Sequence, residues 1–279
     1  LINLFLRIRP IAVHTHHIGP LLYAGLAARL CAIKNLVHTE HDAWHLRNKK
    51  RRVLENTILK LVKPSLVADS KSVKMSFEKY IPGITPNIIL NGVDTEKFSP
   101  GDKKSARLAF KLPADKIIIG CAGRLEEEKG QRILLQALSS LPKKYCIALA
   151  GTGTQREALV EQADQLKLHD RVFFLGHLDN MVQFYRAIDT FCLPSFNEGM
   201  PLAPLEAQAC NVPSVLSNVG GCYESLCPNT GKLVPAGNPH ALAKAVLNYR
   251  KIKTPLEPRD FVVKNANAKT MINDYHNLC

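Results

Sequence analysis

The chain has 279 residues, of which 46% are hydrophobic and 22% charged, and its formal net charge is +13. A chain of this length usually forms one large or two medium domains, and this balance excludes an intrinsically disordered protein. The opening stretch LINLFLRIRP is too short to span a bilayer, and no segment has the three-part pattern of a secretory signal peptide. The eight cysteines form no C-x-x-C pair, which argues against a zinc ribbon and favours reduced, buried thiols in a cytoplasmic protein.

Short apolar runs that end in polar residues alternate with longer amphipathic stretches along the whole chain. The apolar runs predict strands at 11–16, 35–40, 65–70, 87–92, 117–124, 145–153, 171–176, 190–195 and 213–218. Helical periodicity is found at 20–32, 130–141, 155–168, 181–188 and 201–210. Continuous apolar strands separated by helices predict an α/β fold with parallel sheets that are covered on both faces. In such folds ligands bind at the carboxyl ends of the strands, where these runs turn polar.

Two breaks in the pattern divide the chain. Pro100 and Gly101 interrupt it within NGVDTEKFSPGDKK, and two prolines interrupt it again at 251–258. We therefore expect a first domain at 1–99, a second at 100–254 and a C-terminal segment at 255–279 that crosses back to the first. The residues from Phe261 onward are expected to form one helix.

Positive charge is denser in the first hundred residues, which hold 15 Lys and Arg against 7 Asp and Glu. A cluster of cations is formed by Arg47, Lys49, Lys50, Arg51 and Arg52. Such a cluster can attract anionic lipid head groups, nucleic acid or a phosphate-bearing substrate, and a solvated helix face is the alternative. No aromatic stacking pattern accompanies the charge, so nucleic acid is not an expected partner.

Two glycines, Gly151 and Gly153, follow the apolar run YCIALA and open a helix. This arrangement lets backbone N–H groups approach a phosphate. The third glycine of a dinucleotide fingerprint and the lysine of a P-loop are both missing, so a tight turn without a ligand explains the pattern equally well.

The stretch GRLEEEKG places Arg124 and Lys129 at the end of another strand. Two cations on one loop can hold a diphosphate and stabilise the charge that develops as it leaves. The alternative is that both cations pair with the three glutamates between them.

The stretch SFNEGMPLAPLEAQAC carries two acids, Glu198 in a turn and Glu206 eight residues later in a helix that begins at Pro201 or Pro204. Eight residues is a little over two helical turns, so both acids project toward roughly the same side. Carboxylates suit sugar and ribose hydroxyls, because each can accept hydrogen bonds from adjacent OH groups. A surface Glu followed by an unrelated helical Glu is the plainer alternative.

Six of the ten histidines lie before residue 50, and they are His14, His16, His17, His38, His41 and His45. Placed at two adjacent strand ends, they could bind a metal, or one of them could donate a hydrogen bond to a substrate or phosphate. Partly buried histidines that cap strands are the alternative for any one of them.

In order and spacing, NGVDTEKFSP, GRLEEEKG, GTGT, VFFLGHLDNMVQFYRAIDTFCLPSFNEGMPLAPLEAQAC, GGCYESL and TGKLVPAGNPHALAKAV resemble the retaining group 1 glycosyltransferases of family four. The resemblance extends from about Ile11 to the end of the chain. It implies the GT-B fold, with two Rossmann-like parallel-sheet domains of which the first is incomplete, and a nucleotide-sugar donor bound by the second. Relatives carry about three more strand–helix units before their H-x-H strand, which here begins at His14.

The resemblance also implies roles for single residues. Arg124 and Lys129 match the cations that hold the donor diphosphate, Glu198 the acid near the sugar hydroxyls and Glu206 the acid on the ribose. His16 matches the histidine that contacts the transferring sugar. The implied catalytic set is His16, Arg124, Lys129 and Glu198, and the implied donor-binding set is Gly151, Gly153, His177, Leu178, Gly199, Met200, Pro201, Leu202 and Glu206.

The expected function is transfer of a sugar to a lipid-linked or polysaccharide acceptor with retention of configuration. No D-x-D occurs in the chain, so no metal cofactor is expected. The expected location is the cytoplasm, with peripheral contact at the inner membrane face through the basic first part. A non-catalytic nucleotide-sugar-binding remnant and a metal-dependent hydrolase that uses the histidines are the alternatives.

Overall fold

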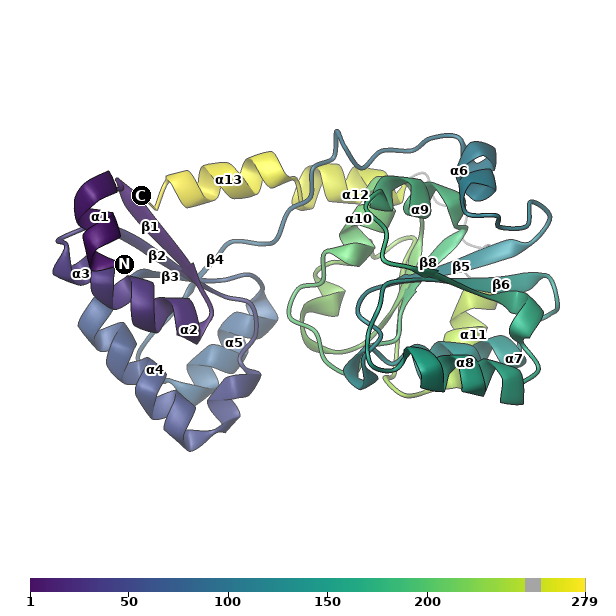
Figure 1. The fold of residues 1–279 in the computed structure, drawn as a ribbon, viewed down its shortest axis with the longest axis horizontal. Helices are drawn as coiled ribbons and strands as arrows, with labels where there is room; N and C mark the ends of the chain where they lie inside the picture. The colour runs from purple at the N-terminus through teal and green to yellow at the C-terminus, as the bar shows by residue number, and fades with distance from the viewer. Residues whose placement is uncertain (249–256, 279) are drawn as a thin grey trace. The chain divides into compact units, whose positions relative to one another are not determined.

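A computed structural model describes residues 1–248 and 257–278, which belong to two compact α/β units (Figure 1). Unit 1 is Leu1–Asn91 together with Lys269–Cys279, and unit 2 is Gly92–Ala268. The chain passes from unit 1 to unit 2 after Asn91, where the sequence pattern places the division at 99/100. It returns after Ala268, where the pattern places the start of the C-terminal segment at 255.

Each unit is built on one sheet in which every described strand pair is parallel. The sheet of unit 1 has the order β1-β2-β3-β4, and its strands are β1 (Ala12–His16), β2 (Asn35–Glu40), β3 (Ser65–Ala68) and β4 (Asn87–Ile88). The sheet of unit 2 has the order β10-β9-β8-β5-β6-β7, and its strands are β5 (Ile117–Ala122), β6 (Tyr145–Ala150), β7 (Val172–Gly176), β8 (Thr190–Leu193), β9 (Ser214–Ser217) and β10 (Lys232–Val234). The strand order of unit 2 reverses between β5 and β8, and doubly wound sheets bind ligands beyond the carboxyl ends of the strands at such a point.

Helices connect the strands in both units. Those in the first segment of unit 1 are α1 (Ile2–Ile8), α2 (Ile18–Pro20), α3 (Leu26–Leu30), α4 (Lys49–Val62) and α5 (Lys71–Tyr80). Those that follow are α6 (Lys103–Ala109), α7 (Gln131–Ser139), α8 (Arg156–Gln165), α9 (Met181–Ala187), α10 (Ala203–Ala209), α11 (Pro239–Asn248), α12 (Pro258–Asn265) and α13 (Ala268–His276). A π-helical turn at Leu21–Gly25 joins α2 to α3.

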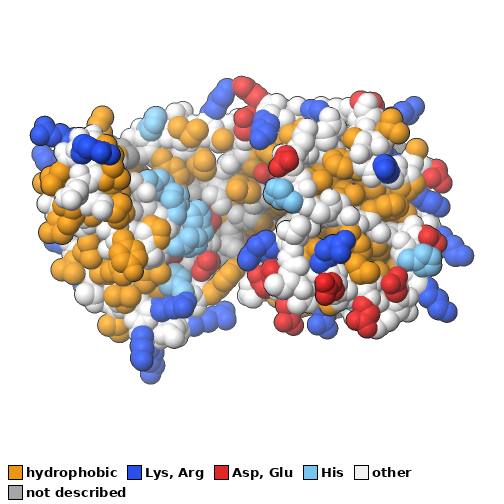
Figure 2. Space-filling view, in the orientation of Figure 1, with side chains coloured by type: hydrophobic (Ala, Val, Ile, Leu, Met, Phe, Trp, Pro, Cys, Tyr) orange, Lys and Arg blue, Asp and Glu red, His pale blue; other side chains and the backbone are white. Residues whose placement is uncertain are grey.

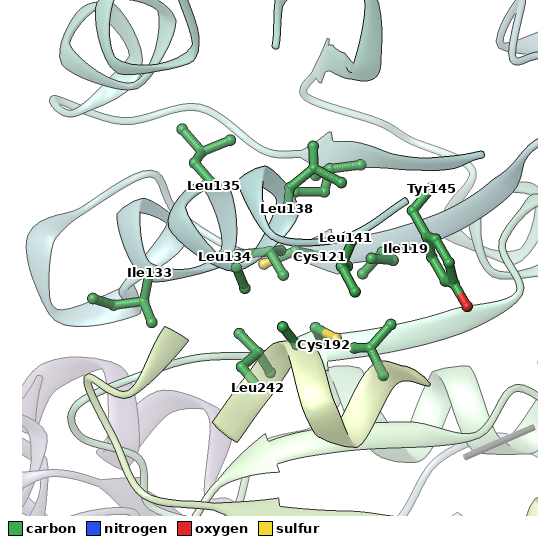
Figure 3. Close-up of a cluster of buried hydrophobic side chains, with 14 of the residues drawn as sticks. Ile119, Cys121, Ile133, Leu134, Leu135, Leu138, Leu141, Tyr145, Cys192 and Leu242 are labelled. Atoms are coloured by element: carbon green, nitrogen blue, oxygen red, sulfur yellow. The ribbon is translucent and has the colours of Figure 1, made fainter. Parts of the chain in front are cut away.

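The core of unit 2 lies between its sheet and the helices α7, α8 and α11 on one face, with α6, α9, α10 and α12 on the other (Figure 1). All residues of β5 and β6 are buried, as a strand covered on both faces requires. Figure 3 shows Leu134 and Leu138 of α7 against Cys121 and the other apolar side chains of this layer. Fully burying one such leucine stabilises the fold by about 1.5–3 kcal/mol.

The sheet of unit 1 is covered by α1 to α5 on one face and by α13 on the other (Figure 1). On the α13 face, Met271, Tyr275 and Leu278 pack against a small apolar cluster of Val37, Val67 and Ile89. The last helix therefore completes the core of the unit in which the chain begins.

The expectation of one terminal helix from Phe261 onward is wrong, because the structure has two helices, α12 and α13, with a break at Ala266 and Asn267. The N–H of Val93 donates to the carbonyl of Ala266 at 2.9 Å, and the N–H of Ala268 donates to the carbonyl of Val93 at 3.0 Å. Val93 and Asn267 thus form an isolated parallel bridge. Hydrogen bonds to a distant segment replace those that would have continued the helix, and periodicity in the sequence does not reveal them.

All nine expected strands are present, most of them shorter than predicted at their polar ends. The pattern missed β10, which is only three residues long. The seven cysteines in the described residues are free, and six of them are buried. Within 1–248 and 257–278, no helix combines the length and the apolar character needed to cross a bilayer.

Candidate functional site

A pocket of about 280 Å³ lies at the carboxyl ends of β5, β6 and β7. It is lined by Ala122, Gly123, Arg124, Ala150, Gly151, Thr152, His177, Leu178 and Met181. The structure thus brings together four residues that the sequence assigned to donor binding or catalysis, Arg124, Gly151, His177 and Leu178. The pocket lies beyond the carboxyl ends of the strands, on the β5 side of the β5/β8 reversal, and β8 contributes none of its lining residues.

The glycines of the β6 loop are needed for close packing between two loops. Gly151 has φ +138°, and a Cβ placed there would lie 2.0 Å from the carbonyl oxygen of Gly123. A Cβ on Gly153 would lie 2.3 Å from the carbonyl oxygen of Leu125. The N–H of Leu125 donates to the carbonyl of Thr152 at 2.8 Å, so the loops after β5 and β6 are joined backbone to backbone. The glycines therefore shape one wall of the pocket whether or not their N–H groups meet a ligand.

Arg124 and Lys129 have different partners. The guanidinium of Arg124 is 72% exposed and pairs with Glu128 at 3.2 Å, the local pairing that the sequence left open as an alternative. Lys129 instead reaches across the chain, and its Nζ lies 2.7 Å from Oε1 of Glu198. Lys129 is therefore tied to the acid that the sequence assigned to the sugar hydroxyls.

Glu198 is a nearly buried carboxylate, and one of its oxygens accepts two hydrogen bonds. Its side chain is 9% exposed, and Oε1 accepts from Lys129 Nζ and from the hydroxyl of Ser195, each at 2.7 Å. Its loop is closed from behind by Gly220, since a Cβ on Gly220 would lie 1.8 Å from the carbonyl oxygen of Glu198. Oε1 is thus fixed by the protein, while Oε2 has no hydrogen-bond partner among the described residues.

The turn Gly199, Met200, Pro201 and Leu202 leads from Glu198 into α10, which begins at Ala203 between the two prolines considered as helix starts. Met200 is buried, whereas Leu202 is exposed. Glu206 lies in the first turn of this helix, and its Oε2 accepts from the Tyr185 hydroxyl at 2.6 Å. Burial raises the pKa of Glu206, and the hydrogen bond from Tyr185 opposes that shift.

In unit 1, histidines gather at the carboxyl ends of β1 and β2, and Figure 2 shows histidine side chains grouped on this unit. His16 Nδ1 lies 2.8 Å from His41 Nε2, and the ring centroids of His14 and His16 are 4.2 Å apart. His41 Nδ1 in turn lies 3.2 Å from Asp69 Oδ2 at the end of β3. The hydrogen bond to Asp69 raises the pKa of His41, whereas burial lowers the pKa of His16 and brings that of His14 to about 4. His41 is therefore the member of this group that carries positive charge most readily.

A second polar network lies beneath this group. In the described residues, the set of side chains whose ligand atoms lie close enough to hold a metal is His38, Glu40 and Glu55, with those atoms within 4.8 Å of one another. His38 Nε2 lies 2.7 Å from Glu40 Oε1, and His45 Nε2 lies 2.5 Å from Glu55 Oε2. Ligand atoms around a tetrahedral zinc are about 3.3 Å apart, so the 2.7 Å between His38 Nε2 and Glu40 Oε1 is the spacing of a hydrogen bond. The histidines that the sequence offered as metal ligands at the first strand end, His14 and His16, are not in this set.

Sequence reasoning missed three residues that the structure joins to the candidate site. Ser195 and Tyr185 donate to Glu198 and Glu206, and Asp69 binds His41. Ser195 and Asp69 could have been noticed as polar residues directly after apolar runs. Tyr185 gives no signal, because it occupies an ordinary apolar position of a helix.

Comparisons with known proteins agree with this architecture. Residues 102–268 match the family model described as glycosyl transferases group 1, and residues 1–97 match the model described as glycosyltransferase family 4. D-inositol 3-phosphate glycosyltransferase of Corynebacterium urealyticum is 32% identical over 236 residues, which cover 78% of this chain and 55% of that protein. O-antigen biosynthesis glycosyltransferase WclY of Escherichia coli is 34% identical over 140 residues, covering 50% of this chain and 39% of that protein.

The fold is similar to the crystal structure of Anabaena HepE in complex with UDP and glucose, with a TM-score of 0.88 at 21% identity, over 99% of this chain and 80% of that chain. This likeness confirms the expected GT-B type fold with two Rossmann-like domains. The matched part of the chain spans 55% of the first of these curated relatives and 39% of the second. The family inferred from the order of the motifs is confirmed, and the chain belongs to the group 1 glycosyltransferases.

Proposed function

We propose that this protein is a glycosyltransferase that takes a sugar from a nucleoside-diphosphate donor bound by unit 2. The observation that carries the proposal is the pocket at the carboxyl ends of β5, β6 and β7, which gathers Arg124, Gly151, His177 and Leu178. The HepE structure with UDP and glucose supports a donor of this class. The acceptor would be a hydroxyl of a lipid-linked or polysaccharide glycan, in line with the name of the relative in O-antigen biosynthesis.

The charges fit a diphosphate leaving group. Lys129 is held by Glu198 and Arg124 by Glu128, so both cations are positioned and neutralised before a donor binds. A diphosphate would draw Lys129 away from Glu198, because two phosphates offer more negative charge than one carboxylate. The carboxylate released in this way can accept hydrogen bonds from the sugar hydroxyls.

Transfer with retention would follow if the acceptor hydroxyl attacks from the same face of the sugar that the phosphate leaves. The leaving phosphate would then accept the proton of that hydroxyl. The residues of unit 2 then position the donor and stabilise an oxocarbenium-like state. His16, with His41 and Asp69 beside it, would contact the transferring sugar from unit 1. In this proposal the cations and N–H groups replace a metal, and activity is expected to survive EDTA.

Nucleotide binding tests the donor site directly. We expect UDP, GDP or ADP at 1 mM to raise the melting temperature of unit 2, because a ligand that binds only the folded state stabilises it. Glu161→Ala, at an exposed position further along α8, is the control for Glu206→Ala. Weaker binding in Glu206→Ala but not in the control supports the site, and a melting temperature unmoved by all three nucleotides would rule out the proposed function.

We further propose peripheral contact with the inner membrane face through α4. The helix begins with Lys49, Lys50, Arg51 and Arg52, and its side chains Val53, Leu54 and Leu61 are exposed by 64%, 43% and 59%. Cations beside exposed apolar side chains suit an anionic bilayer surface. Flotation with vesicles that contain anionic lipid should recover the protein, and changing Val53 and Leu54 to Ser should reduce recovery. Equal recovery with neutral vesicles would contradict the role of the cations.

A further inference from the structure

We propose that Tyr185 is the positioning residue for Glu206, so that recognition of the donor's ribose depends on a phenol that does not touch the nucleotide. This inference rests on the proposed function, because it concerns how unit 2 holds a nucleoside diphosphate. It assigns a role to a buried side chain outside the set of expected contacts.

Tyr185 cannot reach a ligand directly. The residue lies on α9 and has 0% exposure. Its ring is held by Phe98, Phe184 and Phe191, with centroid distances of 6.0, 5.5 and 5.9 Å and edge-to-face geometry in each pair. Such pairs stabilise a fixed ring orientation. Any effect of its hydroxyl on nucleotide binding must therefore pass through the group that it touches.

That group is Glu206. The hydroxyl donates to Glu206 Oε2 at 2.6 Å, and burial keeps the phenol protonated by raising the pKa of Tyr185 well above its ordinary value. A phenol that stays protonated donates across the whole working pH range. A free glutamate samples several rotamers, and a hydrogen bond from an immobile donor selects one of them before the ligand arrives.

The hydrogen bond also determines what Glu206 has left to offer. Oε2 is occupied, whereas Oε1 has no hydrogen-bond partner among the described residues. An ionised carboxylate only accepts hydrogen bonds, so the remaining oxygen matches ligand groups that donate, such as the two adjacent hydroxyls of a ribose. A 2′,3′-dideoxyribose lacks both hydroxyls and so cannot donate to this oxygen.

Glu198 is held in a comparable way but by different chemistry. Its Oε1 is fixed by the buried hydroxyl of Ser195 and by the cation of Lys129, a group that a diphosphate can draw away. Tyr185 is neutral and buried, so no ligand competes for it. The hydrogen bond from Tyr185 to Glu206 therefore persists when a ligand binds, whereas the ion pair between Lys129 and Glu198 changes.

The test measures affinity by calorimetry for the best-binding nucleoside diphosphate and for its 2′,3′-dideoxy analogue. Tyr185→Phe should weaken binding of the ribose form about ten- to a hundredfold, the usual effect of removing a hydrogen bond to a charged group. The same substitution should change affinity for the dideoxy analogue less than about twofold, because Glu206 has no partner there. Tyr145→Phe, a buried tyrosine in β6, is the matched control and should bind both ligands as the wild type does.

A double-mutant cycle keeps the test independent of folding losses. If Tyr185 acts through Glu206, adding Tyr185→Phe to Glu206→Ala should not weaken binding further. An equal loss for both ligands, an additive double variant or an unchanged Tyr185→Phe would each overturn the positioning role. A wild type that binds none of the nucleotides overturns the proposed function itself, and this inference with it. If the wild type binds the nucleotides and Tyr185→Phe binds them equally well, only the inference is overturned.

Discussion

At the scale of single residues, the candidate site combines charges that neutralise one another in the absence of a ligand. Lys129 and Glu198 are 20% and 9% exposed, so each would be costly to leave alone, and each stabilises the other. A ligand that draws Lys129 away from Glu198 must also donate hydrogen bonds to the Glu198 carboxylate. In the proposed function, a donor with both a diphosphate and sugar hydroxyls would do so.

Replacing Lys129 with Met should lower the affinity for UDP by at least about tenfold and change the affinity for uridine by less than about twofold. The reason is that a cation contacts the phosphates and not the nucleoside. Calorimetry with both ligands measures this. Lys143 is an exposed lysine just before the amino end of β6, away from the candidate site. Lys143→Met is therefore the control and should change neither affinity. Equal weakening of UDP and uridine would instead indicate that the loop around Glu198 had collapsed.

The buried network of unit 1 makes its stability depend on pH. Burial opposes charge on His45, but hydrogen bonds to Asp42 and Glu55 outweigh it and raise the pKa of His45 to about 10. A base whose folded pKa lies above its unfolded value of about 6.5 stabilises fully below 6.5, and this stabilisation is lost as the pH rises toward 10.

His45→Gln should therefore lower the free energy of unfolding more at pH 6 than at pH 10. Urea titration followed by the fluorescence of Trp44 reports on this unit, since the chain contains a single tryptophan and it precedes His45. His169→Gln, an exposed histidine of unit 2, should cause no such pH-dependent difference. A loss of the same size at both pH values would show that the charge of His45 does not contribute.

At the scale of elements, loops packed backbone to backbone form the site. The loop after β6 lies against the loop after β5 at Gly151, and the Glu198 loop lies against Gly220. Each contact excludes a Cβ, and each loop follows the carboxyl end of a strand. The strands therefore fix where the loops start, and the glycines fix how closely they approach.

Gly151→Ala should cost at least about 2 kcal/mol of stability and weaken nucleotide binding, because its φ is +138° and its new Cβ would lie 2.0 Å from the Gly123 oxygen. Gly176→Ala is the matched control, since it has φ +71° but open space around the added Cβ. The control should lose about 1–2 kcal/mol and keep its affinity. Urea unfolding and calorimetry measure both quantities, and similar affinities for the two variants would refute the role of loop packing.

At the scale of the whole molecule, each unit has its own sheet and its own apolar core. The chain crosses between them after Asn91 and after Ala268, and the two crossing segments are hydrogen-bonded through Val93, Ala266 and Ala268. All residues assigned to donor binding lie in unit 2, whereas His16 and the other clustered histidines lie in unit 1.

Residues 92–268 expressed alone should accordingly unfold cooperatively and bind the nucleotide within about threefold of the whole chain, since all the residues proposed to bind the donor lie in that unit. Thermal unfolding with and without nucleotide measures both. Glu206→Ala in the excised unit is the control and should reduce the thermal shift. A folded unit 2 that fails to bind would show that unit 1 completes the donor site.

Much of this was available from the sequence because periodicity and composition act locally. Apolar runs that end in polar residues identified the nine strands, the parallel sheets and the edge on which Arg124, Gly151 and His177 meet. The order of the motifs identified the family. Each of these features depends on residues close together in the chain, where a pattern of burial is imposed directly on the sequence.

Only the tertiary structure decided which side chains touch. It paired Lys129 with Glu198 over 69 positions, brought Tyr185 to Glu206, joined His41 to Asp69 and interrupted the terminal helix by pairing Val93 with Asn267. Such contacts depend on how loops and helices pack at separations that no local pattern encodes. The sequence by itself determined the fold, the family and the edge of the sheet that holds the site, and packing determined which oxygen of each acid is left for a ligand.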